Sequence, residues 1–258
     1  MSESLDAVWD YDGIDSNVVC GSVKTMSRAD VNAGIKPEKP ASPPITAVLM
    51  ILEQVWHQGE HPAKLAYEEP LDGLIETVLS QNTNDRNRDM AFARLKELGD
   101  WRTIDGLPRE MIVEAIKPAG ISNNKTNTIK RVLKTVKDTY GDYTLQALKG
   151  MPVDEVRAFM TGIQGVGPKT AACVLAFDLG IPAFPVDTHV ARISKRLGWA
   201  EEKETPAEIQ ERMEKTIPPE LQTGGHLNMI LHGKNTCKAR KPLCGSCPLR
   251  GLCPSSSA

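Results

Sequence analysis

Apolar residues follow the three- and four-residue spacing of amphipathic helices from Ile45 onward. Each stripe predicts a helix with one core-facing side, and the alternation typical of strands is missing. With few aromatic or β-branched runs, this pattern predicts an all-α fold of short helices joined by Gly, Pro and Asn turns. The stripes comprise Val48, Leu49, Leu52, Val55 and Trp56; Leu71, Leu74, Ile75, Val78 and Leu79; Met90, Ala91, Leu95 and Leu98; Met111, Ile112, Ala115 and Ile116; Ile129, Val132, Leu133 and Val136; and Val190, Ile193 and Leu197.

The first 44 residues lack this periodicity and end in a proline-rich run over residues 36–44. Their composition predicts a disordered N-terminal extension over residues 1–44, to which no role is assigned. The N-terminus has neither an apolar run nor an Arg-rich amphipathic pattern, so no secretory signal or transit peptide is expected. We therefore expect a protein that is not secreted and that stays in a reducing compartment.

Composition excludes several classes of protein. The chain has 258 residues, of which 40% are hydrophobic and 25% charged, as in ordinary globular proteins. The longest apolar run, residues 45–52, is far shorter than the roughly 20 residues of a membrane helix, so no membrane partner is expected. The net charge of -2 predicts no polyanion partner by bulk attraction, so any nucleic-acid site must be local.

Residues 152–179 predict a helix, a tight turn and a second helix. Within the turn, Gly165 and Gly167 permit positive φ and close backbone approach, and Pro168 suits the first position of the following helix. Amide groups clustered at a helix N-terminus bind phosphate without needing net charge. An ordinary glycine-capped turn between helices fits the spacing equally well.

Lys169 follows this turn, at the positive end of the predicted helix dipole, which is unfavourable for a purely structural cation. That position favours the neutral amine, which is nucleophilic. Asp187 precedes the stripe that starts at Val190 and is placed to lie near the same turn. By itself, Asp187 is more typical of an ordinary N-cap that accepts from the amide of His189 or Val190.

Cys237, Cys244, Cys247 and Cys253 lie within seventeen residues, in the spacing C-x6-C-x2-C-x5-C. Four thiolates this close can hold a structural zinc ion or an iron-sulfur cluster, and the spacing alone leaves both open. Cys20 and Cys173 are expected to be bystanders. Five basic residues and no acidic ones lie between residues 231 and 253, a local charge that suits phosphate contact.

The glycine turn ending in Lys169, the Val-Asp-Thr-His segment around Asp187 and the cysteine spacing together resemble the endonuclease III family of helix-hairpin-helix DNA glycosylases. The resemblance covers residues 71–253 and includes the Leu-Ser-Gln-Asn-Thr and Leu-His-Gly segments at 79–83 and 231–233. It implies two domains with a DNA-binding cleft between them. One is a six-helix domain over residues 62–182, and the other is a cluster domain made of residues 45–61 and 183–258.

The resemblance also implies roles for individual residues. Lys169 would be the nucleophile of a bifunctional glycosylase and AP lyase, and Asp187 its acidic partner. The four cysteines would bind a 4Fe-4S cluster rather than zinc. The partner would be double-stranded DNA containing oxidised pyrimidines, other damaged bases or abasic sites, bound by a monomer. The location would be the cytoplasm, in association with the nucleoid, in a bacterium, and the nucleus otherwise. The residues expected to contact DNA are Gln81, Ile121, Lys125, Gly165, Gly167, His189, Lys238, Arg240 and Lys241.

This sequence departs from the family pattern near those contacts. The resemblance implies that Gln81 enters the space left by the flipped nucleotide and that Ile121 wedges the opposite strand. Ala119 is smaller than the residue that often precedes the loop glycine, so the depth of this wedge and the lesion preference stay open. Pro168 and Gln164 also differ from the usual residues, but neither change removes a catalytic group. Three alternatives remain: a monofunctional mismatch or alkylated-base glycosylase using Asp187 and water, a non-catalytic protein that binds damaged DNA, and a zinc-bound helical interaction module.

Overall fold

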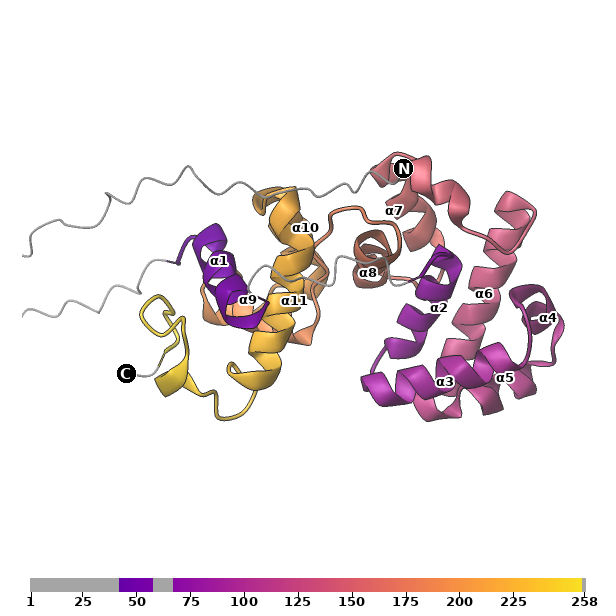
Figure 1. The fold of residues 1–258 in the computed structure, drawn as a ribbon, viewed down its shortest axis with the longest axis horizontal. Coiled ribbons are helices and arrows are strands. Elements are labelled where there is room, and N and C mark those ends of the chain that lie inside the picture. The colour runs from indigo at the N-terminus through magenta and orange to yellow at the C-terminus, as the bar shows by residue number, and fades with distance from the viewer. Residues whose placement is uncertain (1–41, 58–66, 257–258) are drawn as a thin grey trace, which may run out of the picture. The chain divides into compact units, whose positions relative to one another are not determined.

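The computed structural model describes residues 42–57 and 67–256. Of the predicted extension over residues 1–44, only residues 42–44 are described. Cys20 lies outside the described residues. All regular elements of the described ranges are helical, which confirms the predicted all-α class (Figure 1). No helix in these ranges is long and apolar enough to cross a membrane.

Eleven α-helices and three short 3₁₀ helices make up the described chain. They are α1 (Ile45–Trp56), α2 (Pro70–Ser80), α3 (Asp85–Glu97), α4 (Trp101–Gly106), α5 (Arg109–Ala115), η1 (Lys117–Ala119), α6 (Ser122–Tyr140), η2 (Gln146–Gly150), α7 (Val153–Gly162), α8 (Pro168–Asp178), α9 (Thr188–Arg196), α10 (Pro206–Thr216), α11 (Pro219–Asn235) and η3 (Cys244–Ser246).

Local capping signals set several of these helix ends. Thr205 and Glu208 form a reciprocal capping box at the start of α10, with Pro206 at its first position. Helix α6 ends at Gly141, whose φ of +77° is strained for any residue with a Cβ atom. Boundaries of this kind are set by sequence-local chemistry, so they place the helices before tertiary packing begins.

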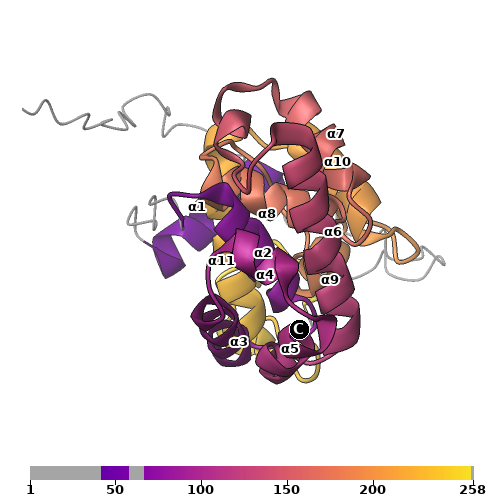
Figure 2. The same cartoon turned by 90° about the vertical axis from the view of Figure 1, so that its right-hand side faces the viewer.

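The buried apolar residues form two clusters. One is built by α2 to α8, with α6 alongside α2 (Figure 2), and the other by α1, α9, α10, α11 and Leu249. The two clusters match the residue ranges of the two predicted domains, except that Ala183, predicted in the cluster domain, belongs to the first cluster. The described residues nevertheless form one compact unit, so the division into two domains stays a prediction.

The structure corrects the expected burial of some stripe residues. Val55, Met90 and Met111 are exposed, because the face that a short helix buries is narrower than its apolar stripe. Helix α11, in contrast, packs on α1 and α9 without an apolar stripe. Its buried face consists largely of small and polar residues, namely Gln222, Gly225, His226, Asn228, Met229, His232 and Gly233.

Candidate active site and cluster loop

Helices α7 and α8 form the predicted hairpin, with a turn over residues 163–167. Ile163 and Val166 anchor the turn in the core, and the Val166 amide donates to the Ile163 carbonyl at 2.9 Å. Gly165 has a φ of +103°, and a Cβ atom there would lie 2.4 Å from Oγ1 of Thr128 on α6. Only glycine satisfies both the backbone angle and this close approach.

Gly167 differs from the expectation of positive φ at both glycines. Its φ is −92°, and a Cβ atom would meet nothing within 4 Å, because the turn has already reversed at Gly165. Gly167 is the N-cap of α8, and no side chain caps this helix end. The first amides of α8 are therefore left without a side-chain acceptor, as they also are at the starts of α1, α5, α6, α7 and α11.

Lys169 is a half-buried residue in the first turn of α8, as predicted. Its ammonium group lies near Cys173, one turn further along the helix. Burial raises the pKa of the Cys173 thiol, and the charge of Lys169 opposes that shift. Cys173 is thus a neighbour of Lys169 rather than a bystander, although its thiol stays protonated.

Asp187 is the N-cap of α9 and accepts from the Val190 amide at 2.8 Å through Oδ1. This is the local role that the sequence also allowed. The cap uses one carboxylate oxygen, and among the described residues no hydrogen bond to Oδ2 is found. A capping carboxylate is held in one orientation, which leaves the second oxygen in a defined position.

His226 on α11 is a site residue that sequence reasoning missed. Burial lowers its pKa to about 4, the charge of Asp187 opposes this shift, and the charge of Lys169 adds to it. Both charges therefore act on one buried, neutral imidazole, which lies against the rings of Phe177 and Phe184. The Gly-Gly-His sequence at 224–226, within a helix lacking an apolar stripe, was the available signal.

Two loops border the hairpin. The Gln81 side-chain amide donates to the Gly165 carbonyl at 3.3 Å and to Oγ1 of Thr170 at 3.4 Å, so Gln81 is turned back onto the hairpin. The next residue, Asn82, is exposed with a φ of +54°. Ile121 on the second loop also has positive φ, at +47°, and is 54% exposed. Both loops line one pocket, whose volume is about 450 Å³ when space open to solvent is included. It is lined by Gln81, Asn82, Ile121, Asn124, Lys125, Thr128 and Gly165.

Lys125 corrects the expectation of a direct DNA contact, because it is only 3% exposed. Its ammonium group donates to the carbonyls of Leu79 and Ala119, both at 2.7 Å. The Leu79 carbonyl lies in the last turn of α2 and the Ala119 carbonyl at the end of η1, so each lies just before one of the two loops just described. A buried ammonium needs such acceptors to offset its lost hydration, so Lys125 joins the loops instead of reaching solvent.

His189, also expected near DNA, is half-buried on α9 and packs against Gly233 on α11. Its Nδ1 lies 3.1 Å from the Arg192 guanidinium. Arg192 donates in turn to the carbonyls of Gly233 and Cys237. Helix α9 thus carries Asp187 at its start and holds the cysteine loop further along.

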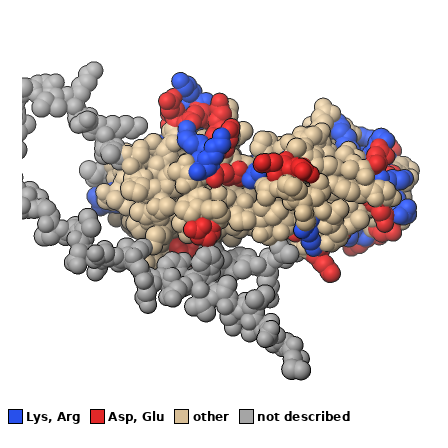
Figure 3. Space-filling view, turned by 90° about the horizontal axis from the view of Figure 1, so that it is seen from above, with Lys and Arg blue, Asp and Glu red and all other residues tan. Residues whose placement is uncertain are grey.

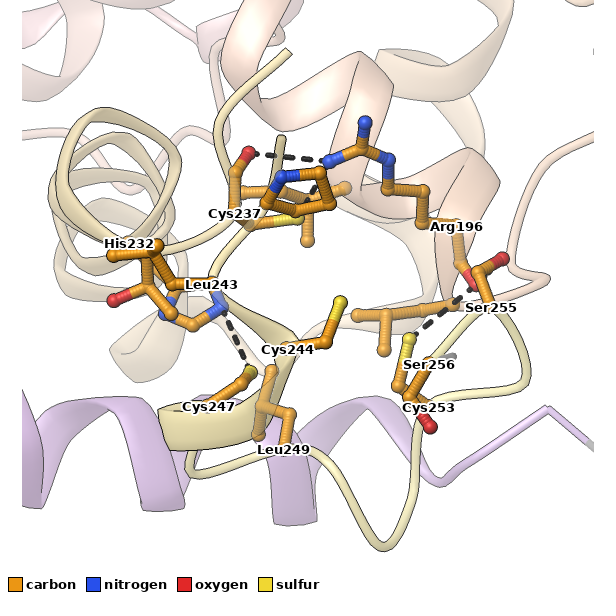
Figure 4. Close-up of a pocket in the computed structure, with 14 residues that line it drawn as sticks. Arg196, His232, Cys237, Leu243, Cys244, Cys247, Leu249, Cys253, Ser255 and Ser256 are labelled. Atoms are coloured by element: carbon orange, nitrogen blue, oxygen red, sulfur yellow. Dashed lines mark hydrogen bonds between the residues drawn. The ribbon is translucent and has the colours of Figure 1, made fainter. Parts of the chain in front are cut away.

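The four predicted cysteines surround one pocket of about 470 Å³, counted out to open solvent (Figure 4). Arg196 donates to Cys237 Sγ at 3.1 Å, and His232 Nε2 lies 3.7 Å from Cys247 Sγ. Among the described residues, no three His, Cys, Asp or Glu side chains converge tightly enough for a single metal ion. Four thiols around one pocket fit a larger group that contacts each of them, as a cluster does.

The loop between Cys237 and Cys244 exposes Lys238, Arg240 and Lys241. Arg196 holds its backbone through the carbonyls of Lys238, at 2.8 Å, and Ala239, at 3.1 Å. Lys234 belongs to the same basic run but faces Asp85 at 3.5 Å, so it adds less free charge than its sequence position suggests. On the face shown in Figure 3, acidic and basic side chains are interspersed, which fits a local rather than a global basic site.

Comparison with known families finds two matches along the chain. Residues 75–219, more than half of the sequence, match the HhH-GPD superfamily of base excision DNA repair proteins. Residues 237–253 match the iron-sulfur binding domain of endonuclease III. The second match begins and ends at the first and last of the four clustered cysteines.

Individual relatives agree with these matches. Endonuclease III of Haemophilus influenzae is 33% identical over 210 residues, covering 81% of this chain and 95% of the relative. Endonuclease III of Thermotoga maritima is 35% identical over 188 residues, covering 72% and 83%. A solved structure of a trapped covalent intermediate of endonuclease III and DNA aligns with a TM-score of 0.71 at 31% identity, covering 82% of this chain and 95% of that one.

Proposed function

The chain belongs to the endonuclease III family of helix-hairpin-helix DNA glycosylases, and on this premise we propose that it is a bifunctional glycosylase and AP lyase that removes oxidised pyrimidines from duplex DNA. Lys169 is the proposed nucleophile and Asp187 its acidic partner. The observation that carries this assignment is geometric: the side-chain amide of Gln210 donates to the Pro168 carbonyl at 3.2 Å and accepts from the Val186 amide at 3.3 Å, next to Lys169 and Asp187 respectively. Two residues 18 positions apart thus share one neighbourhood, as a nucleophile and its acidic partner must.

The proposed reaction begins with flipping of the damaged nucleotide out of the stack, since its glycosidic bond is otherwise inaccessible. The amine of Lys169 then forms a bond to C1′ while the glycosidic bond breaks, and the bonding electrons leave with the base, which is protonated. Asp187 accepts a proton from the attacking amine. Ring opening gives a Schiff base, and removal of a C2′ proton then expels the 3′ phosphate by β-elimination.

DNA binding would use features around this pair. The uncapped amides at the start of α8 suit a backbone phosphate. Asn82 and Ile121 are the exposed, left-handed residues of the two loops, so we assign them, rather than Gln81, to the space left by the flipped nucleotide. Lys238, Arg240 and Lys241 are exposed for phosphate contact. A cleft between two domains and a monomeric state stay predictions.

The chain carries a 4Fe-4S cluster, as its iron-sulfur motif and its endonuclease III relatives indicate. We propose Cys237, Cys244, Cys247 and Cys253 as the ligands. When bound, the cluster supplies positive charge that offsets four thiolates and cross-links the C-terminal loop. Arg196 then keeps the basic residues of the loop in place through its backbone contacts.

Borohydride trapping on a labelled duplex with one thymine glycol tests this proposal. We expect a covalent complex with the wild type, none with Lys169→Ala, and a much slower reaction with Asp187→Asn. Lys203→Ala, which removes a lysine with 85% of its side chain exposed, is the control and should trap normally. Base release without trapping would replace the bifunctional assignment with the monofunctional one. Binding without reaction would favour a non-catalytic protein, once other lesions had been tried.

A further inference from the structure

Gln210 on α10 connects the two segments that precede the proposed catalytic residues. Its side-chain amide donates to the carbonyl of Pro168 at 3.2 Å, and its oxygen accepts from the amide of Val186 at 3.3 Å. Pro168 directly precedes Lys169, and Val186 directly precedes Asp187. Gln210 is only 3% exposed, so both ends of its amide are committed to the protein.

Glu214, one turn further along α10, makes a parallel pair of contacts. It accepts from the Phe184 amide at 3.1 Å and faces the Arg157 guanidinium on α7 at 3.1 Å. Because residues four apart lie on one side of a helix, a single face of α10 holds both the hairpin and the segment over residues 183–187.

That segment has no regular secondary structure. The amides of Phe184 and Val186 are two positions apart, and in an extended chain such groups point the same way. Without α10, both buried amides would lack partners, which is unfavourable. The position of Asp187 therefore depends on side chains that follow it by more than twenty residues.

We propose that Gln210 is a positioning residue for the excision reaction, its amide fixing the separation between Lys169 and Asp187. This rests on the proposed function, since it assumes that those two residues act together. Gln210 supplies both a donor and an acceptor, so neither a carboxylate nor an apolar residue of similar size can replace it. A small change in the spacing of reacting groups lowers the rate strongly without weakening binding elsewhere.

The test compares Gln210→Leu and Gln210→Glu with a matched control, Gln222→Leu. Gln222 is also a buried glutamine, and its amide donates to the backbone carbonyls of Glu214 and Ile217, both at 3.0 Å, at the C-terminal end of α10, so its replacement leaves the Glu214 carboxylate that holds Phe184 in place. For each variant we would measure the single-turnover rate of thymine glycol excision and the rate of borohydride trapping. We would also measure the affinity for a duplex with an uncleavable abasic analogue and the midpoint of thermal unfolding.

We expect both Gln210 variants to excise and trap about 10- to 100-fold more slowly, with analogue affinity near that of the wild type. Gln222→Leu should lose thermal stability to a similar degree yet keep the wild-type rate, measured well below its midpoint. Equal rates for Gln210→Leu and Gln222→Leu would overturn the inference. If the wild type itself never traps, or Lys169→Ala still does, the proposed function fails instead.

Discussion

The carboxyl group of Asp178 lies directly against Gly73, where a Cβ atom would come within 2.1 Å of the carboxyl carbon. This contact lets α8 pack closely on α2, which supports the helix that carries Lys169 at its other end. Asp178 is 2% exposed, and burial, with added repulsion from Glu76 and Asp72, raises its pKa to about 7. The C-terminal end of a helix is also an unfavourable place for an anion.

Asp178→Asn is expected to stabilise the protein at high pH. The pKa of Asp178 is higher in the folded protein than in the unfolded chain. Its contribution to the free energy of unfolding is therefore greatest below pH 3.8, the unfolded pKa, and is lost as the pH rises toward about 7. The gain from the substitution should therefore be on the order of a few kcal/mol at pH 8.5 and shrink toward pH 5. Denaturant unfolding at both pH values measures it, with exposed Asp138→Asn as the control. A gain that does not vary with pH would contradict the buried, ionised carboxylate.

Local sequence features predicted the hairpin, because glycine freedom, proline geometry and capping act within a few residues. The stripe over Ile129, Val132 and Leu133 likewise placed α6 correctly. Lys125 lies four residues before Ile129 and continues that stripe. Its place in the apolar line was a usable signal of burial, but the resemblance to the family, which placed it in a DNA-contacting loop, suggested DNA contact instead.

Long-range partners could not be predicted in this way. Helix α11 has no apolar stripe, because its packing uses small residues and buried polar groups whose partners lie on other helices. Gln210 and His226 matter through segments far away in the sequence, and the bridge from Pro168 to Val186 has no periodic pattern. Their roles follow only from which helices pack together.

Gly165→Ala and Gly167→Ala should separate the shape of the hairpin from its contact with DNA. The first variant combines positive φ with a clash against Thr128, so it should lower the free energy of unfolding by about 1–3 kcal/mol. In the second variant the added methyl group meets open space at an ordinary φ, so the free energy of unfolding should stay within about 0.5 kcal/mol of the wild-type value. If α8 amides bind a phosphate, the methyl group of Gly167→Ala will still weaken DNA binding. Wild-type affinity for this variant would argue against that phosphate contact.

Lys125→Met should uncouple the two loops that border the hairpin. It leaves the buried carbonyls of Leu79 and Ala119 without their donor, which is unfavourable by about 1–3 kcal/mol. Lys130→Met is the matched control, since Lys130 lies on the same helix and donates to carbonyls around the end of α4, those of Asp105 and Leu107 among them.

Both lysine variants should lose comparable stability, but only Lys125→Met should reduce the fluorescence rise of a 2-aminopurine base placed beside the lesion. That signal reports unstacking, which on the proposed assignment depends on the loops carrying Asn82 and Ile121. If Lys130→Met lowers the signal equally, general loss of stability explains the effect and the coupling of the loops is wrong.

Removing the positive charges of the cluster loop should change the salt dependence of DNA binding. Each phosphate contact contributes about 0.9 to the slope of log affinity against log salt, so Lys238→Ala, Arg240→Ala and Lys241→Ala should each reduce the slope by roughly that amount. Affinity should fall about equally for damaged and undamaged duplexes, because phosphate contacts carry no base information. Titrations at several salt concentrations measure the slope, with Lys203→Ala as the control, since Lys203 is a highly exposed lysine beside Glu201 and outside this loop. An unchanged slope in the combined loop variant would mean that these exposed residues face solvent when DNA is bound.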